Sequence, residues 1–242
     1  MNLKKPLFIG YLTLGDGGLD YSLQAARALI EGGVNLLEIG IPFSDPIADG
    51  PVISQAMQRS LDKGTTIHDA IPFVQELRKH TQIPLVLFSY YNPLLSAGET
   101  FLNDVKKAGI DGMLIVDLSF EGMRSSILDP VCVVTPTTSD ERLEKIVKTA
   151  RGFIYYACQK GTTGMRKALP YGIDKEIARI KRHTSLPVVI GFGISNREMA
   201  AEAMSLADGF VVGSYFVAAM ARKAPPQELK QMAEAIDPRR PL

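Results

Sequence analysis

The chain has 242 residues, of which 46% are hydrophobic and 22% charged, as is typical of a globular protein with a sizeable core. Its formal net charge of +1 provides no general attraction for nucleic acid or an anionic membrane. Two cysteines, Cys132 and Cys158, predict neither a disulfide framework nor a cysteine metal site, so we expect a reducing, cytoplasmic location.

Short apolar runs alternate with amphipathic stretches along the whole chain, and each run has the composition of a buried strand. The eight runs are residues 7–12, 35–39, 84–88, 112–116, 131–134, 153–156, 187–190 and 209–212. The first run follows two lysines, but Gly10 interrupts it and no cleavage site follows, so we interpret it as a strand and not as a signal peptide. Capping-box spacing, from Thr138 to Glu141 and from Ser195 to Glu198, predicts two helix starts.

Continuously apolar strands indicate burial on both faces, which is typical of a parallel sheet covered by helices. Eight such units in a chain of this length predict an α/β fold, a closed (β/α)8 or TIM barrel. No linker or low-complexity segment divides the sequence, so we expect residues 1–242 to form a single domain. The fourth unit is the weakest, because the residues between Val116 and Val131 leave room for only about two helical turns.

Glu38 stands near the end of the second predicted strand. If Leu36 points into the barrel, the two-residue period places Glu38 on the same inner face, near the mouth. Partial burial there raises the pKa of a carboxyl group and suits it to acid/base chemistry. The alternative, a glutamate that caps a helix or pairs with a lysine, is about equally consistent with Glu38 alone.

Asp45 and Asp49 lie on the proline-rich loop that follows. Aspartate is a common turn residue, and for either residue alone the turn interpretation is the stronger one. Asp49 gains weight because a second carboxylate opposite Glu38 would give the pocket two chemical roles.

Glycine-rich segments end the seventh and eighth predicted strands, at Gly191-Phe192-Gly193 and at Gly213-Ser214, and each leads into a helix. Backbone N–H groups and a helix N-terminus attract anions, and barrel phosphate sites frequently follow these two strands. Tight turns also need glycine, so only the pair of segments predicts a phosphate site. The segment from Gly161 to Gly164 could add donors or form a mobile loop.

Aromatic residues at strand ends, Tyr11, Tyr90, Tyr155 and Phe192, could enclose a flat apolar ligand or pack as ordinary barrel rim. The three histidines fall in or beside predicted helices, away from the strand ends, so we expect no metal site.

The end of the second predicted strand and the loop after it closely resemble the signature of the tryptophan synthase alpha chain family. The matching residues are Leu37-Glu38-Ile39-Gly40-Ile41-Pro42-Phe43-Ser44-Asp45-Pro46-Ile47-Ala48-Asp49-Gly50-Pro51. Matching segments follow the family order at Leu12-Thr13-Leu14-Gly15-Asp16, Tyr90-Tyr91-Asn92-Pro93, Gly191-Phe192-Gly193-Ile194 and Val212-Gly213-Ser214. The resemblance covers almost the whole chain and implies a (β/α)8 barrel.

The resemblance also implies an activity, the retro-aldol cleavage of indole-3-glycerol phosphate to indole and glyceraldehyde 3-phosphate. Glu38 matches the family's acid/base residue, and Asp49 matches the carboxylate that bonds the indole N–H. Tyr155 and Thr163 match residues that support these carboxylates. The matches to the phosphate site are Gly164, Gly193, Gly213 and Ser214. The matches to the indole pocket are Tyr11, Ile53, Tyr90 and Leu114, and we expect Phe192 to belong to the same pocket.

Family members work with a beta chain in an α2β2 complex, and indole passes to that partner. By resemblance, Pro42, Asp45 and Asn92 face the beta chain. The resemblance implies that this chain needs no cofactor or metal and that the beta chain carries pyridoxal phosphate.

The sequence departs from the family at three places. We expect the helix that usually precedes the first strand to be missing, and the helix after the fourth strand, near Asp117, to be shortened. The loop from Cys158 to Gly164 lacks the familiar Ser-Arg pair at 158–159 and the Val at 162. The last departure bears on loop closure and supports an alternative, a weakly active or inactive alpha chain retained as an allosteric activator of the beta chain. A third hypothesis, another phosphate-binding barrel such as a sugar-phosphate epimerase, lacks the metal ligands that it needs.

Overall fold

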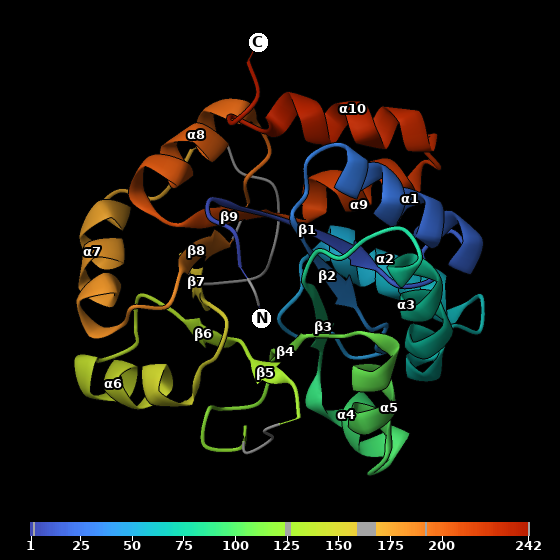
Figure 1. Cartoon of the computed structure of the whole chain (residues 1–242), viewed down its shortest axis with the longest axis horizontal. Helices are drawn as coiled ribbons and strands as arrows, with labels where there is room; N and C mark the ends of the chain where they lie inside the picture. Colours follow the sequence, from blue (N-terminus) through green and yellow to red (C-terminus); the bar gives the residue numbers. More distant parts are fainter. Residues whose placement is uncertain (2, 124–126, 159–167, 192, 242) are drawn as a thin grey trace.

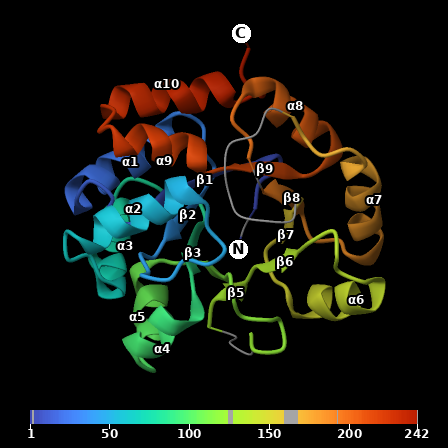
Figure 2. The ribbon, with the colours of Figure 1, turned by 180° about the vertical axis from the view of Figure 1, so that it is seen from behind.

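The computed structural model describes residues 1, 3–123, 127–158, 168–191 and 193–241. Parallel strands form a ring with the helices outside it, and the views from the two sides agree (Figures 1 and 2). The strands are β1 Leu7–Thr13, β2 Leu36–Gly40, β3 Leu85–Ser89, β4 Gly112–Ile115, β5 Asp129–Pro130, β6 Cys132–Val134, β7 Ile154–Ala157, β8 Val188–Gly191 and β9 Gly209–Val212. The helices are α1 Leu19–Glu31, α2 Pro51–Leu61, α3 Ala70–Arg78 after a 3-10 turn at Ile67–Asp69, α4 Tyr91–Ala97, α5 Phe101–Ala108, α6 Asp140–Thr149, α7 Ile173–His183, α8 Arg197–Leu206, α9 Ser214–Ala221 and α10 Pro226–Ile236. None of the described helices is long and apolar enough to cross a membrane.

The expected (β/α)8 barrel is confirmed, with its fifth strand divided in two. The strand order is β5-β4-β3-β2-β1-β9-β8-β7-β6, and all pairs are parallel. β5 pairs with β4 and β6 pairs with β7, and only Val131 separates β5 from β6. The Val131 N–H donates to the Met113 carbonyl at 2.8 Å, so this residue continues the ladder and the sheet closes on itself.

Two apolar layers hold the barrel together. Alternate residues along β1 separate them, because Leu7 and Ile9 pack inside the barrel while Phe8 and Leu12 pack against the helices. The interior cluster comprises Leu7, Ile9, Leu36, Val86, Leu114, Val131, Phe153, Val189 and Val211. Leu36 therefore points inward, as the sequence analysis assumed, and Glu38 follows it two residues later on the same strand.

The two predicted helix starts are present, but each cap lies one residue later than the capping-box spacing indicated. Ser139 accepts a hydrogen bond from the Arg142 N–H at 3.3 Å, and Asn196 accepts one from the Met199 N–H at 2.8 Å. Serine and asparagine both satisfy the first N–H groups of a helix, so the adjacent polar residues competed for the role.

The shortened helix expected after the fourth strand is not a helix in the described residues between β4 and β5. Turn hydrogen bonds take its place, from Gly122 N–H to the Ser119 carbonyl and from Met123 N–H to the Phe120 carbonyl. At the opposite end of the barrel, Met1 and Leu3 pack against the interior cluster, and the N-terminus lies within the ring of strands (Figure 1).

Arg78 joins the N-terminal ends of β3 and β4. Its guanidinium donates to the carbonyls of Gly109 and Ile83, each at 2.6 Å, and to the Asp111 carboxylate at 2.7 Å. Asp111 also accepts from the Leu85 N–H at 2.8 Å, so one network fixes the start of both strands.

We expect Arg78→Gln to lower the free energy of unfolding by about 2 kcal/mol, because several partly buried acceptors lose a charged donor. Urea unfolding of the purified chain measures this difference. Arg142→Gln is the matched control, since the ion pair of Arg142 with Glu121 is exposed on both sides and should contribute little. Equal stability of the Arg78 variant and the unmodified chain would contradict the assignment.

Candidate active site

The C-terminal ends of the strands surround a cavity of about 40 Å³. Residues from β1, β2, β3, β7 and β9 line it together with residues from the loops before α2, α8 and α9 and from the first turns of α2 and α9. They are Tyr11, Glu38, Asp49, Ile53, Phe88, Tyr155, Gly193, Val211, Gly213 and Ser214. The structure therefore brings both candidate carboxylates and the described part of the predicted phosphate site to one place.

Glu38 is the most unusual side chain of the cavity. It is 1% exposed, and neither carboxylate oxygen has a hydrogen-bond partner among the described residues. In the strand register it lies between Tyr11 of β1 and Val86 of β3. Burial without a polar partner raises the pKa of the Glu38 carboxyl from 4.5 to about 8. The group is therefore largely protonated at neutral pH and can donate a proton.

Asp49 is held by a tyrosine from a neighbouring strand end. The Tyr90 hydroxyl donates to the Asp49 carboxylate at 2.8 Å and accepts from the Ala48 N–H at 3.0 Å. Burial, and next the charge of Asp49, raises the pKa of Tyr90 above its ordinary value, so the tyrosine remains a donor. Asp49 directly precedes the N-terminus of α2, where Gly50 is the cap and Pro51 the first residue.

Two tyrosine rings occupy space that two glycines leave open. A Cβ on Gly40 would lie 2.1 Å from the Tyr11 hydroxyl, and a Cβ on Gly191 would lie 2.0 Å from the Tyr155 ring. The pKa of Tyr155 is raised by burial and then by the charge of Glu38, which places the two side chains in one environment. Any larger residue at either glycine would displace a ring from the cavity wall.

The predicted phosphate-binding residues that the structure describes border the cavity together. Gly193 has a φ of 78°, a conformation that favours glycine. Gly213 caps α9 and Ser214 is its first residue, so the N-terminus of this helix faces the cavity. Thr163, Gly164 and Phe192 lie outside the described residues.

The predicted indole-pocket residues are distributed unequally. Tyr11 and Ile53 line the cavity, whereas Tyr90 reaches it through Asp49. Leu114 packs in the barrel interior with Leu36 and Val86 and does not line the cavity.

Three residues of the site were not predicted from the sequence: Phe88 and Val211 in the cavity wall, and Gly40 behind Tyr11. Gly191 was assigned to the predicted phosphate segment, whereas the structure places it behind the Tyr155 ring. The signal available for the glycines was their place at strand ends beside a tyrosine on the next strand. Phe88 contacts Tyr11 edge to face, with ring centroids 5.3 Å apart.

The residues expected to face a partner differ in exposure. Asp45 and Asn92 are exposed, Asn92 on α4, whereas Pro42 is buried. Two apolar side chains on the same segments, Ile47 and Leu95, are 79% and 59% exposed. No group of three or more His, Cys, Asp or Glu side chains in the described part of the chain could hold a metal ion.

A parallel barrel with two buried carboxylates and a helix N-terminus at one mouth defines an enzyme of the (β/α)8 class, with its site at the C-terminal face.

The sequence model of the tryptophan synthase alpha chain matches residues 1–239. The chain is 46% identical to the tryptophan synthase alpha chain of Coxiella burnetii strain CbuK_Q154, over 98% of this chain and 96% of that protein. It is 49% identical to the corresponding Chlamydia felis protein, over 96% and 95% of the two chains. A solved structure of the tryptophan synthase α2β2 complex of Pyrococcus furiosus matches with a TM-score of 0.88 at 35% identity, over 96% of this chain and 98% of that one. The chain belongs to the tryptophan synthase alpha chain family, and membership implies a lyase role in tryptophan synthesis.

The raised pKa of Glu38 makes stability depend on pH. The native state keeps its proton up to about pH 8, whereas the unfolded state loses it near 4.5, so between these values the native state binds more protons. The free energy of unfolding should therefore fall as pH rises through this window, by up to about 1.4 kcal/mol per pH unit.

Glu38→Gln should abolish this contribution, so the variant gains stability relative to the unmodified chain from pH 4.5 to 8. Urea unfolding at a series of pH values measures the difference. Parallel pH profiles of the two proteins would show that the carboxyl is not buried as described.

Tyr90→Phe should lower the free energy of unfolding by about 1–2 kcal/mol, because the Ala48 N–H and the Asp49 carboxylate each lose a bond to the hydroxyl. Tyr171→Phe is the matched control, since Tyr171 is fully exposed. Chemical unfolding compares the two variants, and equal effects would show that the Tyr90 hydroxyl adds nothing to stability.

Proposed function

We propose that the chain cleaves indole-3-glycerol phosphate to indole and glyceraldehyde 3-phosphate by a retro-aldol reaction. The observation that carries the proposal is the pair of carboxylates on one cavity, of which Glu38 is buried with a pKa of about 8 and Asp49 is held by Tyr90. Environments that differ in this way give two carboxylates different roles.

Glu38 is the acid/base residue in this mechanism. Its proton is added to ring carbon C3, while Asp49 accepts a hydrogen bond from the ring N–H and stabilises the positive charge on the ring. The hydroxyl group next to the ring then gives its proton to the Glu38 carboxylate. As the carbon–carbon bond breaks, its electron pair returns to the ring and the hydroxyl carbon becomes the aldehyde, so no net proton is consumed.

The remaining site residues bind the two ends of the substrate. We assign the phosphate to Gly193, Gly213 and Ser214 at the N-terminus of α9, where N–H groups and the helix dipole favour an anion. Gly164 is proposed to complete this set. Tyr155, like Thr163, is proposed to support the carboxylates.

We assign the indole ring to the wall that Tyr11, Ile53 and Phe88 form. Tyr90 contributes through Asp49, and Phe192 is proposed to complete the pocket, whereas Leu114 lies in the barrel interior. Catalysis by this chain is proposed to need no cofactor.

We also propose that a beta chain carrying pyridoxal phosphate binds this chain in an α2β2 complex and receives the indole. The exposed side chains of Asp45 and Asn92, next to the exposed apolar residues Ile47 and Leu95, support a partner surface there. The related Pyrococcus furiosus protein is part of such a complex.

A second candidate function is activation of the beta chain with little cleavage. The departure of the segment from Cys158 to Gly164 from the family pattern favours it, because this segment bears on loop closure. A chain that binds the beta chain but closes poorly over its own substrate would act as an activator only.

Indole release from indole-3-glycerol phosphate tests the proposal, with the purified chain alone and with its beta partner. Glu38→Gln should reduce kcat by roughly 10²- to 10⁴-fold, because the acid/base group is lost. Glu76→Gln, an exposed change on α3, should leave kcat unchanged. Cleavage that survives in the Glu38 variant would refute the mechanism, and no cleavage by the unmodified complex, with the beta reaction still stimulated, would establish the activator.

A further inference from the structure

The segment Leu12-Thr13-Leu14-Gly15-Asp16 belongs to the family signature, yet none of its residues lines the cavity. Its one charged residue is Asp16, whose side chain is buried, with 1% exposed. Arg59 on the last turn of α2 binds this carboxylate with two parallel hydrogen bonds, from Nε to Oδ1 and from Nη2 to Oδ2, both 2.8 Å long. Such a paired geometry fixes direction as well as distance.

Further contacts hold the same loop against the end of α2. The Ser60 hydroxyl donates to the Leu14 carbonyl at 2.5 Å. Gly15 has a φ of 77°, and a Cβ there would lie 2.1 Å from the Thr65 hydroxyl oxygen, so the loop packs closely on the residues that follow the helix. Hydrogen bonds and close packing therefore both hold the loop against the C-terminal end of α2.

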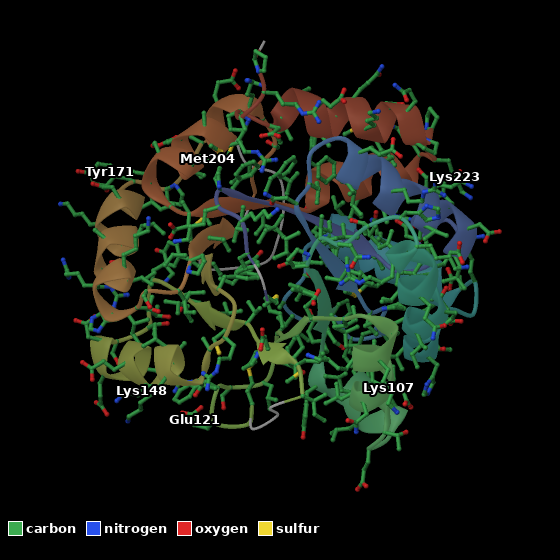
Figure 3. All side chains as sticks on the ribbon, in the orientation of Figure 1. Lys107, Glu121, Lys148, Tyr171, Met204 and Lys223 are labelled. Carbon is green, nitrogen blue, oxygen red and sulfur yellow. The ribbon has the colours of Figure 1, made fainter. Side chains whose placement is uncertain are left out.

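The other side of the loop is joined to the end of α9. The Lys223 ammonium donates to the Gly17 carbonyl at 2.9 Å, and the Tyr21 hydroxyl donates to the Ala224 carbonyl at 2.7 Å. Lys223 lies at the periphery of the molecule, far from the centre of the barrel (Figure 3). We call these contacts, with the Asp16–Arg59 and Ser60–Leu14 bonds, the β1–α1 clasp.

The two helices that the clasp joins both begin at the cavity. Asp49 directly precedes α2, and Gly213 and Ser214 begin α9. Along their length the helices pack together, with Met57 of α2 and Val217 of α9 in one apolar cluster with Tyr11. The clasp therefore holds the far ends of the helices whose near ends carry the carboxylate and the phosphate site.

We propose that Asp16 and Arg59 are positioning residues of the lyase reaction, which set the place of Asp49 relative to the phosphate site through the axis of α2. This inference rests on the proposed function. Arg59 lies nine residues after Gly50, roughly 13 Å along the helix at 1.5 Å per residue. A tilt of about 4–5° at the clasp moves the N-terminus of α2 by about 1 Å, and a misplacement of this size can cost about 10²-fold in rate.

A purely structural ion pair predicts something different, namely lower stability with unchanged kinetics in the molecules that remain folded. Arg78 provides the comparison, because it makes a similar network at the opposite end of the barrel, remote from the strand ends that carry the cavity. Lysine at 59 keeps the charge but cannot form two parallel bonds to one carboxylate.

The experiment measures kcat and KM for indole-3-glycerol phosphate cleavage by the complex with the beta chain, for the unmodified chain, Arg59→Gln, Arg59→Lys and Arg78→Gln. Melting temperatures are recorded for all four. Calorimetric titration with inorganic phosphate adds a readout that needs no turnover. We expect Arg59→Gln to lower kcat/KM roughly 10- to 100-fold with phosphate binding retained, because Lys223 still holds α9.

Arg59→Lys should show a smaller loss in the same direction, and it serves as the test if Arg59→Gln does not fold. Arg78→Gln should melt earlier with unchanged kcat/KM. Equal kinetic effects of the Arg59 and Arg78 changes, or none from either, would overturn the positioning role while leaving the lyase assignment intact. Absence of cleavage by the unmodified complex would instead overturn the proposed function, and the inference with it.

Discussion

The site depends on one constraint, the burial of the Glu38 carboxyl at the end of an otherwise apolar barrel interior. Leu36 and Val86 pack beside it in the core, and both of its oxygens lack partners among the described residues. Burial favours the neutral form of such a group over the charged form, and the raised pKa of Glu38 expresses this. The neighbouring strands fix its backbone on both sides, so the barrel retains a side chain that would otherwise turn toward water.

The rest of the cavity follows from how rings and helices are held around that carboxyl. Tyr11 and Tyr155 reach it because Gly40 and Gly191 leave room for their rings. Asp49 is held at its carboxylate by Tyr90, and the helix that follows it is held at its far end by the Asp16–Arg59 pair.

Local patterns were enough for much of the fold. Each of the eight apolar runs overlaps a strand, since burial on both faces leaves a continuous signature that needs no knowledge of the partner strand. The capping-box spacing placed the starts of α6 and α8 one residue before their observed caps, Ser139 and Asn196, because neighbouring polar residues can serve equally as caps. The connection after β4 was expected to contain a short helix, but its described part forms turns, with hydrogen bonds from Gly122 to Ser119 and from Met123 to Phe120.

The sequence by itself determined the strands of the barrel, because continuous apolar runs are a local pattern, and it placed Asp49 on the loop after the second strand and glycine segments at the ends of two others. The two-residue period of a strand gave Glu38 the same direction as Leu36, but not which way that direction points. Only the tertiary structure decided that Glu38 has no partner among the described residues, that Leu114 packs in the barrel interior and not on the cavity, and that Asp16 pairs with Arg59. These facts depend on distances between residues far apart in the chain. Closure of the barrel fixes those distances, and no local pattern encodes them.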